Sequence, residues 1–404
     1  MPKKGYMIRI VSYFYHMMTN TSFLFSVNVN KPNILVISNS SREFESSQFL
    51  TDINSNLFSF TIGNYQKRIG ISSYLVGIIF TPVVFYNLLK LKKSERNFVK
   101  YCFDQIMLCA GLHFSLQKII NEKTTKGVFI SNHVSPISRV GMKIAKSKKI
   151  KLIYLEHTQM IDAWSKIECD YFLLSGKNSL TKLLNKENQT YEKIFLIGSP
   201  KIDRLIPQNK MKNISICIGS EDNMKKIVSL INQLQIHFNK KRILVRPHPS
   251  LDRKMYKKYL KNLNVDIQHP ENQSLYEFFN CSDIIITNES GIFFEAGYAD
   301  KLILRYMFSE KPLKNYSIKN NFLFGYITNE KQLIDSISSF NYQSSKIRLS
   351  FKEYYDNIGT IYDGNSSLLG LSALGKIGLI KSELINKNEI FWKKNENDIF
   401  SVKD

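Results

Sequence analysis

The sequence contains little cysteine. Five cysteines are spread over 404 residues, and no two of them form a C-x-x-C pair: Cys102, Cys109, Cys169, Cys217 and Cys281. Disulfide frameworks and zinc sites need cysteines at short, repeated spacings, so neither is expected here. We expect buried thiols in a protein that works in a reducing compartment.

Motifs that mark several other chemistries are missing as well. The sequence has no G-x-S-x-G elbow, no P-loop, no H-E-x-x-H and no D-x-D with metal-ligand neighbours, which argues against the enzyme classes that carry them. It also lacks zinc-finger spacings and basic motifs interleaved with aromatic residues, so nucleic acid is not an expected partner. The N-terminus has no apolar core followed by a small-residue cleavage site, and we expect no secretory signal.

Acidic residues are scarce relative to basic ones. Asp and Glu number 34 against 56 Lys and Arg, which gives a net charge of +22 and a sequence pI near 9.5. This imbalance favours an anionic partner, such as an acidic membrane surface or a phosphorylated substrate. The lysines are scattered among Asn and Ile, however, as in "KIAKSKKIK". The compositional bias of an AT-rich genome would produce the same richness, and both explanations stay open.

Long apolar runs are rare, with one exception. Residues 69–90, "IGISSYLVGIIFTPVVFYNLLK", are interrupted by Pro82, Asn87 and several hydroxyls. Their length approaches the ~20 residues that cross a bilayer, but the interruptions favour a buried or surface-docking helix pair over a transmembrane span. With the basic residues that follow, such a segment would suit the anionic cytoplasmic leaflet of a membrane.

The sequence does contain a regular alternation of apolar runs and helical segments, typical of parallel βαβ units. The expected strands of the first half are 33–41, 127–131, 151–157, 170–176 and 193–200, and the stretch 42–126 has no clear periodicity. Those of the second half are 214–220, 242–249, 265–270, 283–291 and 302–306. We predict an α/β fold of two Rossmann-like, doubly wound domains with a cleft between them. The predicted boundaries are 1–206, 207–375, and a tail or helix at 376–404 that crosses back to the first domain.

Polar clusters follow four strands of the second half at their carboxyl ends. They are Gly219–Asp222, Arg246–Pro249, His269–Pro270 and Thr287–Gly291. Ligands of open α/β sheets bind at this edge, so the clusters should share one rim of the sheet. His269 is expected to be a turn residue.

A nucleotide phosphate suits this rim. Ser290 and Gly291 stand where a strand turns into a helix, and free backbone N–H groups at such a turn bind anions. Glu295, one helical turn further, would accept hydrogen bonds from ribose hydroxyls. His248 and Arg246 would contact the leaving phosphate from a loop that two prolines make rigid. An ordinary helix cap and a strand-terminal turn are the alternatives. The predicted nucleotide-binding residues are Gly219, Ser220, Arg246, His248, Asn288, Glu289, Ser290, Gly291 and Glu295.

The first half should supply the acceptor side and a general base. Glu156, His157 and Asp162 lie at and after the end of a predicted strand. A hydroxyl acceptor needs a base with a pKa near neutrality, and an imidazole or a carboxylate can serve. We predict His157 as the base, with His248 and Asp162 as further catalytic residues. His133, at the end of the preceding strand, is the alternative base.

This layout resembles the GT-B superfamily of nucleotide-sugar enzymes over roughly residues 125–380. His248-Pro249 and the hydroxyl-rich loop 287–291 are similar to motifs with which CDP-glycerol glycerophosphotransferases and bacterial polysialyltransferases hold a cytidine-nucleotide donor. "SDIIITNESGIFFEAGYADKLILRY" and "IGSPKIDRL" resemble segments of non-hydrolysing UDP-N-acetylglucosamine 2-epimerases. His157-Thr158 replaces a His-Gly of the transferases, and "ISICIGSEDN" lacks the epimerases' His-Arg segment. Transfer is therefore the favoured reading.

The resemblance implies a metal-independent GT-B glycosyltransferase or polyol-phosphate transferase with a nucleotide-activated donor, CMP- or CDP-linked, and no further cofactor. The acceptor would be a bacterial cell-surface polysaccharide or glycolipid, as in capsule, lipooligosaccharide or a teichoic-acid-like polymer. The expected location is cytoplasmic and peripheral, on the anionic inner face of the cell membrane. Two alternatives stay open: a UDP-N-acetylglucosamine 2-epimerase-like enzyme, and a non-catalytic basic protein that binds membrane or polymer.

Overall fold

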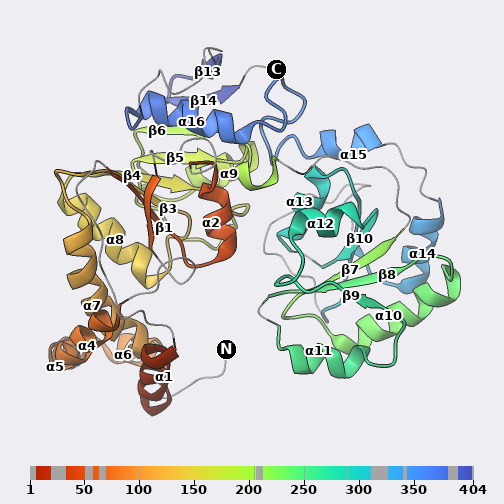
Figure 1. Cartoon of the computed structure of the whole chain (residues 1–404), viewed down its shortest axis with the longest axis horizontal. Coiled ribbons are helices and arrows are strands. Elements are labelled where there is room, and N and C mark those ends of the chain that lie inside the picture. The colour runs from red at the N-terminus through yellow and green to blue at the C-terminus, as the bar shows by residue number, and fades with distance from the viewer. Residues whose placement is uncertain are drawn as a thin grey trace.

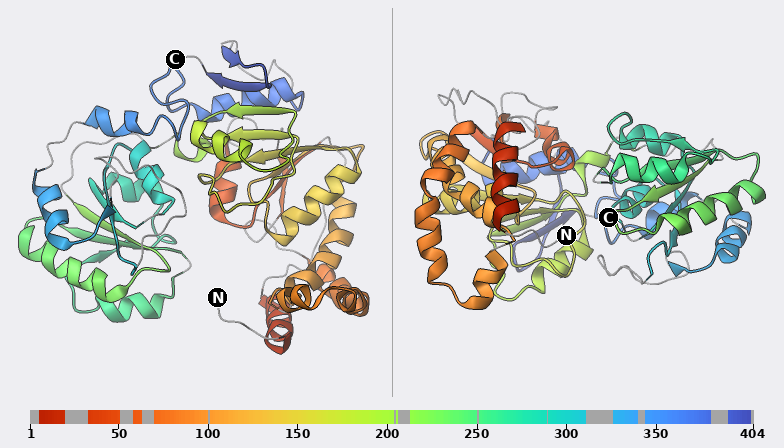
Figure 2. Two further views of the ribbon diagram at one scale, coloured as in Figure 1. Left: turned by 180° about the vertical axis from the view of Figure 1, so that it is seen from behind. Right: turned by 90° about the horizontal axis from the view of Figure 1, so that it is seen from below.

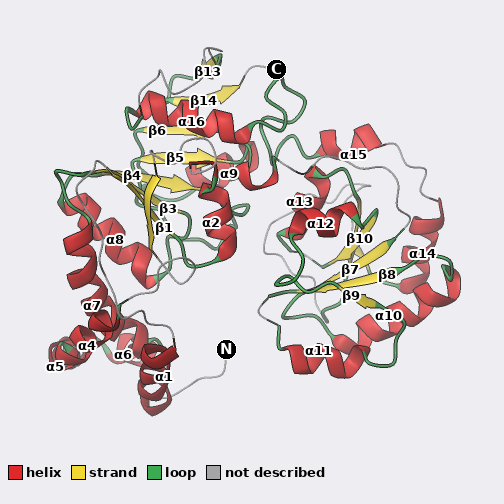
Figure 3. Ribbon diagram, viewed as in Figure 1, coloured by secondary structure: helices red, strands yellow, loops and turns green. Residues whose placement is uncertain are grey.

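Two parallel sheets, each covered by helices, form two domains side by side (Figure 1). The computed structural model describes residues 6–19, 33–50, 58–62, 70–99, 101–203, 205, 213–249, 251–288, 290–310, 326–339, 344–380 and 390–402. Helices lie on both faces of the sheets (Figure 3). The predicted α/β class with two Rossmann-like, doubly wound domains is confirmed.

The first domain is built on an eight-stranded sheet of order β13-β14-β6-β5-β4-β3-β1-β2. All neighbouring strands are parallel except β13 and β14. The central strands are short, nearly continuous apolar runs, as expected for strands that are buried on both faces. The bounds are β1 Asn33–Ile37, β2 Phe58–Ile62, β3 Thr125–Ile130, β4 Lys151–Leu155, β5 Tyr171–Leu174, β6 Lys193–Leu196, β13 Trp392–Lys394 and β14 Ile399–Val402.

Side-chain caps stabilise the N-terminal ends of two helices of the first domain, α2 and α8. In α8, the Ser135 side chain accepts a hydrogen bond from the Ser138 N–H, and Pro136 occupies the first turn, where its missing N–H costs nothing. The bounds are α1 Tyr6–Thr19, α2 Ser41–Ser47, α4 Ile71–Ile79, α5 Thr81–Leu89, α6 Lys93–Val99, α7 Phe103–Ile119, α8 Pro136–Ser147 and α9 Lys177–Leu184.

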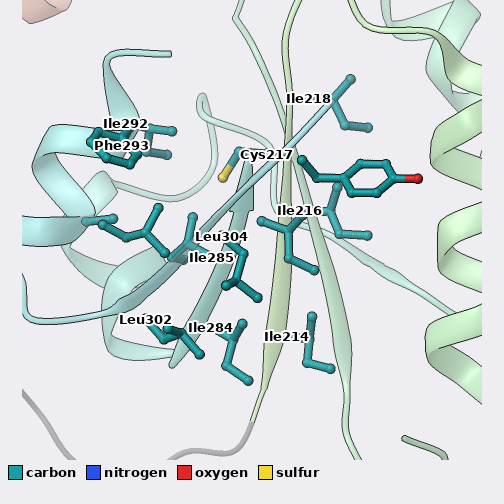
Figure 4. Close-up of a cluster of buried hydrophobic side chains, with 14 of the residues drawn as sticks. Ile214, Ile216, Cys217, Ile218, Ile284, Ile285, Ile292, Phe293, Leu302 and Leu304 are labelled. Carbon is teal, nitrogen blue, oxygen red and sulfur yellow. The ribbon is translucent and has the colours of Figure 1, made fainter. Parts of the chain in front are cut away.

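The second domain has a six-stranded parallel sheet of order β12-β11-β10-β7-β8-β9. Its core is rich in isoleucine from β7, β10 and the adjoining helices (Figure 4). The strands are β7 Ile214–Ile218, β8 Ile243–Pro247, β9 Asp266–Ile267, β10 Ile284–Thr287, β11 Leu302–Tyr306 and β12 Tyr326–Ile327. The helices are α10 Met224–His237, α11 Arg253–Leu260, α12 Leu275–Asn280, α13 Ile292–Tyr298, α14 Glu330–Ser339 and α15 Ser344–Ser350.

The chain leaves the first domain through the 3-10 turn η1 (Pro200–Ile202) and returns at α16 (Ser366–Ile377). The Asp203 carboxylate ties the two crossings together, because it accepts hydrogen bonds from the Ser366 and Ser367 N–H groups at 2.9 and 2.7 Å. α16 packs in the core of the first domain. The segment that crosses back to the first domain therefore begins at Ser366, about ten residues before the predicted start at 376.

The C-terminal tail ends in two strands where a tail or helix was expected. β14 pairs in parallel with β6 and adds to the edge of the first sheet. Phe400 stacks on Phe195, with ring centroids 4.7 Å apart, and Trp392 covers the same ring edge-on. Phe400 and Val402 are buried in the core on one face of the sheet and Ile399 in the core on the other face, and this burial explains the strand.

The apolar run 69–90 folds as the helices α4 and α5, which are bent by 49° relative to each other. Among the described residues, no single helix is long and apolar enough to cross a membrane, whereas this bent pair passes both criteria when taken together. α4 lies against α7 at very close range: a side chain at Gly111 would collide with the Ser73 backbone. The run therefore forms a helix pair docked on the first domain.

Candidate active site

The carboxyl ends of β7, β8 and β10 meet at one edge of the second sheet. Ile218 is paired with Pro247, and Thr287 with Cys217, so the loops that follow these strands are neighbours. A pocket at this edge is lined by Gly219, Arg246, His248, Pro270, Ser290 and, from the first domain, Arg42. We call it the cation pocket. Four of the predicted nucleotide-binding residues thus come together in space.

Arg246 is the buried cation of this pocket. Its side chain runs along the Phe278 ring, 4.8 Å from the centroid, and Nη2 donates to the Gln273 carbonyl at 3.2 Å. Nη1 is buried with no hydrogen-bond partner among the described residues. Burial lowers the pKa of the guanidinium, and an anion at Nη1 would both satisfy this donor and stabilise the charge.

His248 is half-buried beside Arg246. Its backbone N–H donates to the Ile218 carbonyl at 2.8 Å, which fixes the Arg-Pro-His-Pro loop on the strand edge. Burial, and secondarily the positive charge of Arg42, lower the pKa of the imidazole. The ring is therefore neutral near pH 7 and can still donate one hydrogen bond to a phosphate oxygen.

Asn288 links the loops that follow β7 and β10. Its amide donates to the Asp222 carboxylate at 2.8 Å, and its carbonyl oxygen accepts from the Tyr326 hydroxyl at 3.1 Å. The same carboxylate accepts from the Gly219 N–H at 2.6 Å. These hydrogen bonds hold the loops after β7 and β10 together, and the predicted contacts of Gly219 and Asn288 with a donor stay predictions.

The remaining predicted residues of this loop region differ in placement. Ser220 is exposed at the loop surface, and Glu289 lies outside the described residues. α13 begins at Ile292 with Gly291 as its N-cap and without a side-chain cap. Ser290 lines the cation pocket and Gly291 lines an adjoining pocket, so the strand-to-helix turn faces both pockets, and its binding of a nucleotide stays a prediction.

The adjoining pocket lies between the domains and contains His157. Ser199 and Lys201 contribute to it from the first domain, and Gly291 and Glu295 from the second. We call it the histidine pocket. Burial, then the positive charge of Lys201, lower the pKa of His157 to about 3. Its Nδ1 is buried with no hydrogen-bond partner among the described residues, so the imidazole is neutral with an uncommitted nitrogen.

Glu156, next to His157, is structural. Its carboxylate accepts hydrogen bonds from the Met160 and Ser175 N–H groups and from the Ser179 hydroxyl, at 3.0, 2.6 and 2.5 Å. Burial raises its pKa. This fully buried network fixes the loop after β4, and hence the direction in which His157 points.

The structure does not bring Asp162 to either pocket. Its side chain is 59% exposed and lies 3.9 Å from Lys182, and its backbone carbonyl accepts from Lys186. The β4 loop carries Asp162 around the outside of the domain, which the strand-end argument could not foresee. His133, the alternative base, is buried against Trp164, and burial lowers its pKa to about 4.

Sequence reasoning missed two residues that line these pockets, Lys201 and Arg42. Lys201 forms an ion pair with Glu295 across the domain boundary at 2.5 Å, with both side chains buried. Burial raises the pKa of Glu295, but the charges of Lys201 and Arg42 outweigh it and leave the pKa below its usual value. Arg42 and Lys201 follow β1 and β6, so the carboxyl-end rule applied to the first domain would have found them.

No group of three or more His, Cys, Asp or Glu side chains in the described part of the chain could hold a metal ion. The notion of metal-independent chemistry stays a prediction.

Comparisons with known proteins point to one family of transferases. A model of the family described as CDP-glycerol:poly(glycerophosphate) glycerophosphotransferase matches residues 112–368. The teichoic acid glycerol-phosphate primase of Bacillus subtilis (strain 168) is 23% identical over 296 residues, which cover 66% of this chain and 72% of the primase.

Solved structures share the fold. A putative UDP-N-acetylglucosamine 2-epimerase from Listeria monocytogenes aligns with a TM-score of 0.57 at 11% identity, over 89% of this chain and 100% of that one. The wall teichoic acid polymerase TagF, soaked with CDPG, aligns with a TM-score of 0.52 at 10% identity, over 92% of this chain and 97% of that one. Such low identities show the fold alone, which is of the GT-B type.

Proposed function

The chain belongs to the CDP-glycerol:poly(glycerophosphate) glycerophosphotransferase family, and on that premise we propose that it transfers a polyol phosphate from a CDP-linked donor, CDP-glycerol first of all, to a cell-envelope polymer or glycolipid. The observation that carries the proposal is the cation pocket. In this pocket the Nη1 atom of Arg246 is buried without a hydrogen-bond partner among the described residues. A diphosphate would supply an anionic acceptor for it.

The donor diphosphate fits the edge of the second sheet. Arg246 and His248 would contact its oxygens from β8, and Ser290 from the turn before α13, while Arg42 reaches the same pocket from the first domain. Binding would therefore draw the two domains together. The helix start at Ile292 adds backbone N–H groups with a favourable dipole.

The reaction that follows is a displacement at phosphorus. The acceptor hydroxyl oxygen bonds to the phosphorus that carries the polyol, the bond from this phosphorus to the bridging oxygen breaks, and CMP leaves with the electron pair. His157 accepts the hydroxyl proton at its uncommitted nitrogen. Arg246, Arg42 and His248 stabilise the charge that develops on the leaving phosphate.

The electrostatics of the histidine pocket couple proton transfer to donor binding. Without donor, burial and the charges of Lys201 and Arg42 keep the pKa of His157 near 3, which makes it a weak base. The negative charge of a bound diphosphate offsets both cations and raises this pKa. His157 would thus become an effective base only when the donor is present.

The proposed location is the cytoplasmic face of the cell membrane, where a soluble nucleotide donor and a membrane-bound acceptor meet. The net charge of +22 supports attraction to an anionic surface.

Nucleotide binding tests the proposal directly. Thermal shifts are measured with CMP, CDP, UDP and GDP, followed by CMP release from CDP-glycerol with and without a glycerophosphate-primed acceptor. We expect a cytidine-selective shift and acceptor-dependent CMP release. A UDP-selective shift with epimerisation of UDP-N-acetylglucosamine in the absence of acceptor would overturn the transferase. No shift with any nucleotide would favour the non-catalytic basic protein.

A further inference from the structure

A cavity in the first domain belongs to neither pocket of the candidate active site. It has a volume of about 220 Å³ and is lined by residues of α1, α4 and α7, by the first turn of α8 and by Asn39. These helices gather at the end of the first domain that lies away from β13 and β14 (Figure 2). We call it the tyrosine cavity. The lining residues that matter below are Tyr13, Asn39, Tyr74, Asp104, Gln105 and Leu108.

Asp104 is the buried carboxylate of the tyrosine cavity. It stands in the first turn of α7, where the helix dipole favours a negative charge, and it is only 9% exposed. Its Oδ2 lies 3.4 Å from Nη1 of Arg9 on α1, whereas Oδ1 is buried with no hydrogen-bond partner in the described part of the chain. A buried acceptor without a partner is costly, so a hydrogen-bond donor on a ligand would stabilise it.

The charges at this place favour a neutral ligand. A cation would meet Arg9 as well as Asp104, and a phosphate would meet the Asp104 carboxylate, so each would be repelled at short range. A hydroxyl group avoids both conflicts, because it donates to a carboxylate oxygen without bringing a charge. The cavity therefore suits a ligand rich in hydroxyl groups and differs in chemistry from the cation pocket.

The rest of the lining combines aromatic, apolar and amide groups. The Tyr13 and Tyr74 rings meet edge to face with centroids 5.1 Å apart, and the Tyr13 hydroxyl donates to the Tyr74 carbonyl at 2.7 Å. Leu108 adds apolar surface, and Gln105 brings an amide from an exposed position. A saccharide ring matches this lining, because its C–H faces pack on apolar and aromatic side chains while its hydroxyls pair with amides and carboxylates.

The size of the cavity limits the ligand to one ring. Its volume of about 220 Å³ is several times the ~30 Å³ that a liquid water molecule occupies. It is smaller than the pockets of about 300–1,000 Å³ that hold drug-sized ligands. A single saccharide unit can enter, and the remainder of a longer acceptor must extend out of the cavity.

The cavity reaches the edge of the first sheet that carries His157. Asn39 follows β1 at its carboxyl end, and its amide donates to the Ser135 hydroxyl oxygen in the loop after β3 at 2.7 Å. β3 lies between β1 and β4, and His157 follows β4. At a spacing of about 4.8 Å between neighbouring strands, the ends of β1 and β4 are about 10 Å apart. A ring in the cavity is therefore too far from His157 to carry the hydroxyl that reacts.

We propose that the tyrosine cavity binds a neutral saccharide ring of the acceptor, and that this ring precedes the unit whose hydroxyl reacts at His157. Asp104 accepts hydrogen bonds from hydroxyls of the ring, and Tyr13 and Tyr74 contact its C–H surface. The enzyme thus selects its acceptor partly by a unit that does not react. The inference rests on the proposed function for the identity of the ligand as an acceptor, but saccharide binding is measurable without any reaction.

Saturation-transfer difference NMR on the full chain tests the cavity. The probes are the methyl glycosides of N-acetylglucosamine, glucose and galactose, with choline and glycerol 3-phosphate as charged competitors. We expect at least one glycoside to bind through its ring protons and neither competitor to displace it. Asp104→Asn should weaken binding roughly tenfold or more, the range for a hydrogen bond to a charged group, and Gln105→Ala about two- to tenfold. Leu108→Trp, which fills the cavity, should abolish binding.

Asp335→Asn is the matched control for the loss of a carboxylate. Asp335 is exposed on α14 of the second domain, so its substitution should leave glycoside binding unchanged. The Gln105 side chain is exposed as well, so Gln105→Ala keeps the test valid if a substitution at Asp104 or Leu108 prevents folding.

Three outcomes would overturn the proposal. They are no binding of any glycoside to the wild type, binding that the cavity variants leave as strong as in Asp335→Asn, and displacement of the glycoside by choline or glycerol 3-phosphate. Thermal shifts with CDP separate this inference from the proposed function. A CDP shift without glycoside binding overturns the saccharide site alone, whereas glycoside binding without a CDP shift supports the saccharide site and overturns the nucleotide site.

Discussion

The two sides of the interdomain cleft differ in charge. On the second domain, Arg246 is a buried cation whose Nη1 has no hydrogen-bond partner in the part of the chain that the structure describes. On the first domain, His157 lines the histidine pocket and is held neutral, since burial lowers its pKa to about 3. Similar sheets with ligand loops at corresponding edges thus provide two different environments.

This difference assigns the tasks. A cation with free donors binds and stabilises phosphate charge, whereas a neutral imidazole accepts a proton. Arg42 and Lys201 complicate the division, because they place first-domain cations beside both pockets. Because a bound diphosphate would offset the charges of Arg42 and Lys201, these two residues would couple donor binding to the basicity of His157.

Removing the imidazole of His157 should have the largest effect. We expect His157→Ala to lower the turnover number roughly 10²- to 10⁴-fold, the usual contribution of a general base. The thermal shift with CDP should persist, because the proposed phosphate contacts are made by the cation pocket, whose lining does not include His157. His237→Ala, at the exposed C-terminal end of α10 in the second domain, serves as the control, because His237 lines neither pocket. An equal loss in both variants would contradict the assignment.

Breaking the ion pair between Lys201 and Glu295 should come next. Both side chains are buried, so Glu295→Gln leaves an unpaired cation and should lower the free energy of unfolding by about 3–5 kcal/mol. Urea denaturation measures this. The double variant Lys201→Met/Glu295→Leu should recover much of the loss. If Glu295→Gln instead weakens only CDP binding, the predicted ribose contact is the main role of this carboxylate.

Substituting Arg246 should have a smaller effect that is confined to the donor. Arg246→Gln should weaken CDP binding roughly 10- to 100-fold, the range expected for one charge-assisted contact. Arg246→Lys should recover part of the affinity, because it keeps the charge but loses the fork of donors. Isothermal titration with CDP measures both, and unchanged affinity in Arg246→Gln would remove this residue from the donor site.

The second domain was well predicted from the sequence because its units are regular. Each apolar run from Ile214 to Tyr306 contains a strand, although β9 is only Asp266–Ile267 where 265–270 was predicted. The strand-end rule placed Arg246, His248 and Ser290 at one edge of the sheet, where they line one pocket. Parallel strands that are buried on both faces appear in the sequence as continuous apolar runs, and such runs are easy to recognise.

The structure of the first domain was harder to predict from the sequence, for physical reasons. α4 buries small residues and exposes large ones, so its pattern does not show which side faces the protein. Asp203, which joins the two crossings, makes contacts more than 160 residues away, and no local pattern reports such a pairing. Glu156 is a polar residue at a strand end, yet its carboxylate is bound by neighbouring residues of the same domain.

Stability below pH 6.5 should reveal the neutral histidines. The pKa values of His157 and His133 in the folded state, about 3 and about 4, are below the usual 6.5, so between these values the unfolded chain binds more protons. Stability should therefore fall as the pH drops from 6.5 toward 4, by at most about 1.4 kcal/mol per pH unit for each histidine.

The variant His157→Gln isolates one of these histidines. Buried Glu43 and Glu156, whose pKa values are raised by burial, act in the opposite direction, but they contribute equally to both proteins. The difference in free energy of unfolding between wild type and variant should decrease as the pH falls from 6.5 to 4. A constant difference would mean that His157 is not held neutral by the fold.

Substituting Asp162 should have the smallest effect of all. Its carboxylate is largely exposed, it faces Lys182, and its loop is directed away from the cleft. We expect Asp162→Asn to change turnover less than about twofold, since exposed ion pairs of this kind contribute little. Steady-state rates beside those of His157→Ala provide the comparison. A loss above about tenfold would approach that expected for a missing general base. It would mean that the loop after β4 turns inward when substrate binds and brings the Asp162 carboxylate to His157.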